Sequence, residues 1–183
     1  MGRDDGRERR FQALYAEHVG AVARYAARRA DAADVHDVVS EVFLVAWRRL
    51  DDVPDDPLPW LLGTARGTIA NRRRSALRRR SLGSRLAADP IWALATRTVE
   101  DAPEVDRRLL AAIRDLPDRE REAFMLVAWD GLDARRAADA AGCTAATFRM
   151  RLHRARRRLR QSVAVFGPDN TTTDVCATAE EPR

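Results

Sequence analysis

Arginine is concentrated in the last third of the chain, where residues 149–160 hold seven arginines and no acidic residue. All 33 basic residues of the sequence are arginine, and the net charge is +5. An arginine side chain is a planar, permanently charged fork of N–H donors, which binds a phosphate group or the edge of a guanine base through two parallel hydrogen bonds. The chemistry that this segment indicates is therefore the recognition of nucleic acid.

Two further segments carry charge that is mostly of one sign. Residues 57–88 hold eight arginines and no acid, whereas residues 31–56 hold eight acids and two arginines. Segregated charge of this kind predicts two basic surfaces and one acidic surface, and thus two kinds of partner. The simpler alternative for each segment is a charged face that only meets solvent.

No pattern in the sequence indicates catalysis or a metal site. There is no Ser/His/Asp arrangement and no glycine-rich phosphate loop, and Cys143 and Cys176 lack the spacing of zinc ligands or of a disulfide framework. The histidines His18, His36 and His153 are scattered, and we expect them on the surface. We therefore expect neither enzymatic activity nor a cofactor.

The elements that must position the charged residues are helices. Apolar residues recur with helical spacing and no stretch alternates with a period of two, which predicts an all-α fold. Residues 51–59 contain three prolines and are expected to form a loop. The tryptophans Trp47, Trp60 and Trp129 are assigned to packing. The helices are expected over residues 11–29, 35–50, 60–74, 104–115, 118–130, 133–141 and 144–161.

The second expected helix carries an acidic stripe beside its apolar face. Asp34, Asp37 and Glu41 are three and four residues apart, so they lie on one side of the helix. The first helix is expected to turn a set of apolar side chains inward. These are Phe11, Leu14, Tyr15, Val19 and Val22.

Residues 132–144 have the pattern of a helix-turn-helix. Alanines allow two helices to cross closely, Gly142 supplies the positive φ that ends the first of them, and Thr144 is placed to cap the next. The next helix has an apolar stripe made of Phe148, Leu152, Ala155 and Leu159. The rest of its surface is available to DNA. The residues expected there are Thr144, Thr147, Arg149, Met150, Arg151, His153, Arg154 and Arg157.

Composition divides the chain into five parts. No apolar run approaches the ~20 residues of a membrane span, and the N-terminal residues are too charged for a secretion signal, so we expect a cytoplasmic protein without membrane insertion. The parts are an N-terminal extension at 1–10, a helical domain at 11–75, a linker at 76–103, a second helical domain at 104–161 and a tail at 162–183 that is expected to be disordered.

Short segments in both domains match a known family in order and spacing. In the second domain they lie at 115–117 (DLP), 119–122 (RERE), 131–132 (GL) and 149–156 (RMRLHRAR), and in the first at 11–15 (FQALY), 34–43 (DVHDVVSEVF), 46–50 (AWRRL) and 60–62 (WLL). They resemble region 4 and region 2, respectively, of bacterial RNA polymerase sigma factors. Because the chain has no room for regions 1 and 3, it resembles the small extracytoplasmic-function (ECF) group of the sigma-70 family.

The resemblance implies a sigma factor made of two small helical domains, region 2 and the helix-turn-helix region 4, joined by a flexible linker. The implied partners are core RNA polymerase, promoter DNA and an anti-sigma factor. The acidic stripe of Asp34, Asp37 and Glu41 would dock on a coiled coil of the largest polymerase subunit.

The resemblance also implies two contacts with promoter DNA. Region 4 would read the −35 element as duplex through the exposed residues of the helix at 144–161. Region 2 would capture unstacked bases of the −10 element with the loop at 51–59 and the helix after it, because an extruded base needs a pocket that receives it. The residues implied at −10 are Asn71, Arg72, Arg73 and Arg74.

The chain departs from the family at two positions, and two other functions stay open. Many relatives carry asparagine where this chain has Gly67, one turn before Asn71, and a smaller or polar residue where it has Met150. Gly67 keeps open a sigma-like protein that binds polymerase without melting DNA. The other alternative is a stand-alone helix-turn-helix transcriptional regulator whose N-terminal half is an interaction module.

Overall fold

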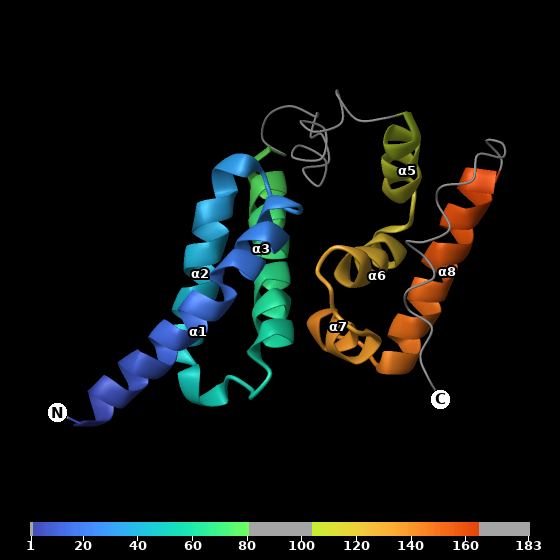
Figure 1. The fold of residues 1–183 in the computed structure, drawn as a ribbon. Helices are drawn as coiled ribbons and strands as arrows, with labels where there is room; N and C mark the ends of the chain where they lie inside the picture. Colours follow the sequence, from blue (N-terminus) through green and yellow to red (C-terminus); the bar gives the residue numbers. More distant parts are fainter. Residues whose placement is uncertain (1, 81–103, 165–183) are drawn as a thin grey trace, which may run out of the picture. The chain divides into compact units, whose positions relative to one another are not determined.

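The computed structural model describes residues 2–80 and 104–164, with side chains for 5–78 and 108–162 (Figure 1). These residues are helical and contain no strand, so the predicted all-α class with two helical domains is confirmed. Residues 76–80 of the expected linker at 76–103 belong to the helix that ends at Arg80, and residues 162–164 of the expected tail at 162–183 belong to the helix that ends at Ala164. The rest of both segments, 81–103 and 165–183, lies outside the described residues. None of the described helices is both long and apolar enough to cross a membrane. The chain divides into two compact units, residues 1–100 and 101–183.

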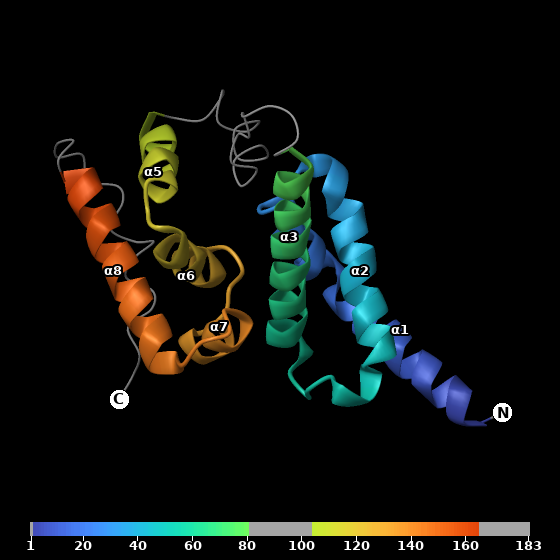
Figure 2. The ribbon, with the colours of Figure 1, turned by 180° about the vertical axis from the view of Figure 1, so that it is seen from behind.

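The N-terminal unit is a bundle of three helices that all pack on one another. Figures 1 and 2 show α2 and α3 antiparallel and side by side, with α1 running obliquely across them. Short 3-10 turns, η1 and η2, precede and follow α2. The elements are α1 (Gly2–Ala27), η1 (Ala32–Asp34), α2 (Val35–Arg48), η2 (Leu50–Asp52) and α3 (Pro57–Arg80).

The core of this unit comes from apolar side chains spaced three and four residues apart on each helix. Of the apolar residues predicted on one face of α2, Val38, Val42, Phe43 and Ala46 are buried, while Val35 and Val39 are half-buried. On α1, Leu14 and Val22 are buried as predicted, but the prediction for Tyr15 was wrong, because its side chain is 44% exposed. The largest side chains that are fully buried are Val22, Tyr25, Val38, Val42, Leu50, Leu61 and Leu62.

The boundaries of α1 and α3 differ most from the sequence-based prediction. α1 begins at Gly2 rather than at residue 11, so residues 2–10 of the expected extension at 1–10 are part of the helix. α3 begins at Pro57 and ends at Arg80, so the expected loop up to residue 59 is shorter. Proline fits the first turn of a helix because the N–H that it lacks has no partner there. Pro57, which was expected in the loop, is therefore the first residue of α3.

In the C-terminal unit α8 packs against each of the other three helices. The boundaries agree with the predicted helices within a few residues. Its core includes Ile113, Leu132 and the predicted stripe Phe148, Leu152, Ala155 and Leu159, all of which are buried. The helices are α5 (Glu104–Arg114), α6 (Asp118–Ala128), α7 (Ala134–Ala140) and α8 (Ala145–Ala164).

The junction between α7 and α8 has the capping groups of a helix-turn-helix, as predicted. The Asp133 carboxylate accepts hydrogen bonds of 2.9 Å from two backbone N–H groups at the start of α7. Gly142 has φ of 62°, and the N–H of Cys143 donates to the carbonyl of Ala138, which closes α7 with a Schellman motif. The N–H of Thr147 donates to Oγ1 of Thr144 at 3.2 Å, which caps α8.

Two further predictions about burial were wrong. His18 was expected on the surface, but it is only 8% exposed, because it lies one turn from both Leu14 and Val22 on the inner side of α1. Trp129 was assigned to packing, but it follows the last residue of α6 and is 38% exposed. His36 and His153 are exposed as expected, and Trp47 and Trp60 are half-buried.

Candidate functional site

The outer face of α8 presents the residues that the sequence assigned to duplex DNA. Because Phe148, Leu152 and the rest of the apolar stripe anchor one side of the helix, the other side faces solvent. Met150 is 51% exposed, and Thr147 and Arg151 are half-buried at the edges of the stripe. The exposed candidates are Thr144, Arg149, Met150, His153, Arg154 and Arg157.

Most arginines of this face have no acidic partner. In the described part of the chain no acid forms an ion pair with Arg149, Arg151, Arg154 or Arg157. A different arginine of α8, Arg158, does form an ion pair, because its Nε lies 2.9 Å from Oε2 of Glu120 on α6. The face therefore carries uncompensated positive charge, which attracts phosphate and is free to hydrogen-bond with base edges.

Two charged residues that sequence reasoning left without a role hold this unit together. Glu120 and Arg121 are buried although both are charged. Arg121 donates from Nη1 to the carbonyl of Arg114 at 2.8 Å and pairs with Asp118, so it joins the end of α5 to the start of α6. Glu120 joins α6 to α8 through Arg158. Both residues lie in the RERE segment at 119–122, so the match of this segment to the family was the one sign in the sequence that they matter.

The acidic stripe on α2 is confirmed as a cluster, and α3 supplies it with a cation. Nη1 of Arg72 lies 3.2 Å from Asp34 and 3.3 Å from Asp37, and its Nε lies 3.5 Å from Glu41. One guanidinium thus serves three carboxylates, which leaves the cluster with a formal charge of −2. Sequence reasoning had placed these residues in two separate sites, one for protein and one for DNA.

The four residues implied at −10 face different ways. Arg73 is half-buried, and its Nη2 donates to the carbonyl of Arg29 at 2.6 Å. Asn71 and Arg74 are exposed and hydrogen-bonded to each other. Successive residues of a helix point about 100° apart, so four in a row cannot share one face. A DNA contact by Arg72 or Arg73 stays a prediction.

The exposed side of α3 includes Gly67, where we expect the sequence to depart from the family. Gly67 is exposed one turn before Asn71, and no atom lies within 4 Å of the place that a Cβ would take. A side chain at this position would therefore project into solvent beside Asn71 and Arg74.

The connection between α2 and α3 is anchored from inside. Leu50 is 1% and Val53 is 7% exposed, and the N–H of Asp52 donates to the carbonyl of Arg49 at 2.9 Å. Nε of Arg49 also lies 3.1 Å from the Asp52 carboxylate. The connection is therefore an ordered turn with acidic side chains on its surface.

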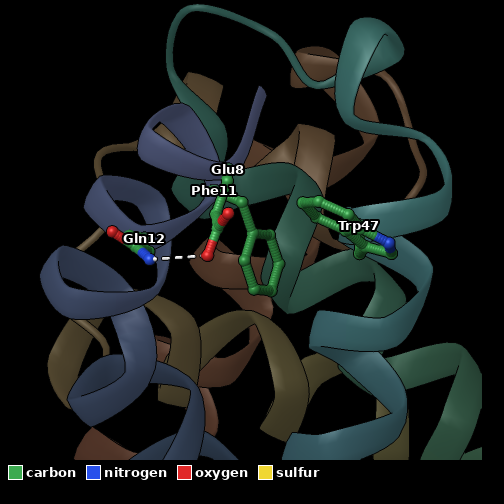
Figure 3. A pocket seen from close by; sticks show the side chains of 4 residues that line it. All are labelled: Glu8, Phe11, Gln12 and Trp47. Atoms are coloured by element: carbon green, nitrogen blue, oxygen red, sulfur yellow. Dashed lines mark hydrogen bonds between the residues drawn. The ribbon is translucent and has the colours of Figure 1, made fainter. Parts of the chain in front are cut away.

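Beside this connection, α1 and α2 form an aromatic cluster that the sequence did not predict as a unit. The rings of Phe11 and Trp47 meet edge to face with centroids 5.1 Å apart, and those of Tyr15 and Phe43 with centroids 4.7 Å apart. A pocket of 460 Å³ adjoins it, lined by Glu8, Phe11, Gln12 and Trp47 (Figure 3). Gln12 donates to the Glu8 carboxylate across one side of this pocket at 3.2 Å.

Within residues 5–78 and 108–162 no group of three or more His, Cys, Asp or Glu side chains is placed to hold a metal ion. Cys143 is half-buried and not in a disulfide, and Cys176 lies outside the described residues.

Comparison with protein families places each unit in a known class. Residues 14–80 match the family described as Sigma-70 region 2, and residues 106–159 match Sigma-70, region 4. The chain is similar to the ECF RNA polymerase sigma factor SigL of Mycobacterium tuberculosis, with 33% identity over 163 residues that cover 86% of this chain and 90% of SigL. It is 34% identical to EcfG of Rhodopseudomonas palustris, over 80% of this chain and 82% of that relative.

Solved structures with the same fold include two that were determined with a second protein. The sigma factor RpoE of Bartonella quintana, in complex with the anti-sigma factor NepR, aligns with a TM-score of 0.62 and 21% identity, over 85% of this chain and 97% of that one. CnrH, in complex with the cytosolic domain of CnrY, aligns with a TM-score of 0.60 and 24% identity, over 87% and 91%. These likenesses show a shared fold.

Proposed function

The chain belongs to the ECF group of the sigma-70 family and is an RNA polymerase sigma factor, and we propose that its two domains divide promoter recognition between them. Region 4 reads duplex DNA at −35, and region 2 captures bases at −10. Sigma factors are regulators rather than enzymes, which agrees with the sequence-based prediction of no enzymatic activity.

The outer face of α8 carries this proposal. A helix that follows a helix-turn-helix junction enters the major groove with its exposed side chains toward the bases. Arg149, Arg151, Arg154 and Arg157 have no ion pair among the described residues, so DNA binding there breaks no ion pair within that part of the chain. Most such contacts go to phosphate and position the helix, while a smaller number read bases.

At −10 the proposal uses the exposed residues of α3 and the connection before it. Asn71 and Arg74 face solvent together, and Gly67 leaves open space beside them. Bases taken out of the stack need hydrogen-bond partners and a surface that receives them, and the phosphates beside them favour a nearby arginine.

The acidic cluster of Asp34, Asp37 and Glu41 is the proposed docking site for core polymerase. Its formal charge after pairing with Arg72 is −2, so a basic partner surface is attracted to it. A charge reversal here would also place a cation beside Arg72 and strain the unit. Neutral amides of the same shape are therefore the cleaner test of docking.

An anti-sigma factor is the proposed regulatory partner. RpoE and CnrH, which share this fold, were solved in complex with NepR and with the cytosolic domain of CnrY. A partner that covers either the acidic cluster or the outer face of α8 would block one of the contacts that initiation needs.

Run-off transcription with purified core polymerase and genomic fragments tests the proposed function. We expect specific transcripts that require this chain and disappear when Arg151 and Arg154 are both replaced by alanine. The control is Arg9→Ala, which removes one charge from α1, outside both DNA surfaces. A chain that fails to bind core polymerase and protects a palindrome unaided would instead be a stand-alone regulator.

A further inference from the structure

The first turns of α1 lie ahead of the segment that matches region 2, which begins at residue 14. They are helical all the same, and Arg7 and Arg10 reach from them to the connection between α2 and α3. We propose that Arg7 and Arg10 are positioning residues that hold this connection, residues 49–56, in the form that receives the −10 strand. The proposal rests on the sigma-factor function proposed above.

Arg7 caps the end of α2. Its Nη2 donates to the carbonyl of Trp47 at 2.7 Å, and Trp47 is the penultimate residue of α2. The last four carbonyls of a helix have no partner within it, and the helix dipole makes this end negative, so a guanidinium is favoured there. The same group lies 5.3 Å from the centroid of the Trp47 ring, over its face. Arg7 thus supplies a partner for a carbonyl at the end of α2, directly before the connection.

Arg10 continues the contact along the connection. Its Nη2 donates to the carbonyl of Val53 at 3.4 Å, and its Nη1 lies 4.0 Å from Asp51. Nη1 of Arg7 lies 3.4 Å from the other oxygen of the same carboxylate. Arg7 and Arg10 are three residues apart and so lie on one side of α1. Together they contact the end of α2 at Trp47 and the connection at Asp51 and Val53.

These contacts complete the anchoring of the connection. On its inner side Leu50 and Val53 are buried in the core of the unit. On its outer side α1 supplies the hydrogen bonds to Trp47 and Val53. Loss of the arginines would leave the apolar anchors in place, so we expect a looser connection in a domain that still folds.

The arginines also change the charge that a DNA strand meets. The connection carries four acids, Asp51, Asp52, Asp55 and Asp56, which repel phosphate. Arg7 and Arg10 lie beside Asp51, and Arg49 pairs with Asp52. Exposed ion pairs contribute little to stability. The hydrogen bond from Arg7 to the Trp47 carbonyl, which positions the connection, therefore has a larger effect than these ion pairs.

Arg9 offers a matched control for the experiment. It lies in the same turn of α1 and has the same charge, but its side chain pairs with Asp5 one turn earlier at 2.9 Å. The first measurement is backbone hydrogen exchange of residues 49–54 in the full chain. In Arg7→Ala we expect exchange about tenfold faster, as for the loss of one charge-assisted hydrogen bond, and no change in Arg9→Ala.

The second measurement is the rate of promoter opening with core polymerase. We expect a fall of about tenfold in Arg7→Ala, partial recovery in Arg7→Lys, which keeps one donor but not the fork, and unchanged affinity for core polymerase and for −35 duplex. Unchanged exchange in Arg7→Ala, or an equal loss of opening in Arg9→Ala, overturns the proposal. If the wild-type chain opens no promoter, the proposed function fails, while the exchange data alone still decide whether Arg7 holds the connection.

Discussion

The two arginine-rich helices, α3 and α8, use the same residue in opposite ways. On α3, Arg72 is paired with three carboxylates and Arg73 donates to a backbone carbonyl, so both are bound within their own domain. On α8, Arg154 and Arg157 are exposed and pair with no acid of the described residues. The difference lies in the neighbours, because α3 packs beside the acidic side of α2 and α8 packs through its apolar stripe.

This difference shows that a run of arginines does not measure the size of a DNA-binding surface. Guanidinium groups that face carboxylates are already satisfied, and DNA must compete with these contacts. On α3 the surface that we propose for DNA is therefore narrower than the run of residues 71–74 and centres on Asn71 and Arg74. On α8 most of the exposed circumference remains available.

Neutralising the acidic cluster is the change with the largest expected effect. Asp37→Asn with Glu41→Gln should lower the affinity for core polymerase about a hundredfold, because two charge-assisted contacts of an interface are lost. Titration of core polymerase with labelled protein measures this. Asp31→Asn, an exposed acid three residues before the cluster, is the control. Equal affinities of the double variant and the wild type would remove the docking assignment.

Removing an arginine should affect stability on α3 but not on α8. We expect Arg72→Ala to destabilise the N-terminal unit by about 2 kcal/mol, less than for a fully buried pair because Arg72 is one-third exposed. Arg154→Ala should stay within about 0.5 kcal/mol of the wild type. Hydrogen exchange resolves the two units separately. Similar losses in both variants would show that the two helices do not differ as described.

On α8 the expected effect concerns DNA rather than stability. Arg154→Ala should weaken binding to −35 duplex by about 1.5 kcal/mol, with the loss confined to sequences that carry a particular base if Arg154 reads guanine. Binding to a set of single-base variants of the duplex measures this. A loss that is uniform across the set would identify a phosphate contact instead.

The smallest expected effect tests the narrow surface of α3. Gly67→Asn places an amide in open space beside Asn71 and should strengthen binding of a −10 single strand about threefold, as for one exposed hydrogen bond. Gly67→Ala is the control, because it stabilises the helix without adding a hydrogen-bonding group. If the affinity for the single strand rises equally in both variants, helix stability rather than recognition explains the change.

The first turns of α1 are a part of the fold that the sequence patterns did not predict. The charged residues 1–10 contain no apolar period, so they were assigned to an extension before the helix. Residues 2–10 are helical in the structure, with Arg7 bound to Trp47 at the end of α2 and Arg10 bound to Val53 in the connection between α2 and α3. Contacts between residues some forty positions apart leave no local pattern, and the role of Arg7 was therefore not predictable.

The sequence by itself determined the helical class, the helix-turn-helix and the charge of each surface. Helical period, a glycine with positive φ at 142 and the capping residues Asp133 and Thr144 act within a few residues of the chain, so they can be recognised without the fold. The tertiary structure decided which charges meet one another. Arg72 is turned onto Asp34, Asp37 and Glu41, and Arg154 is turned to solvent, because packing of whole helices sets the partners of each side chain.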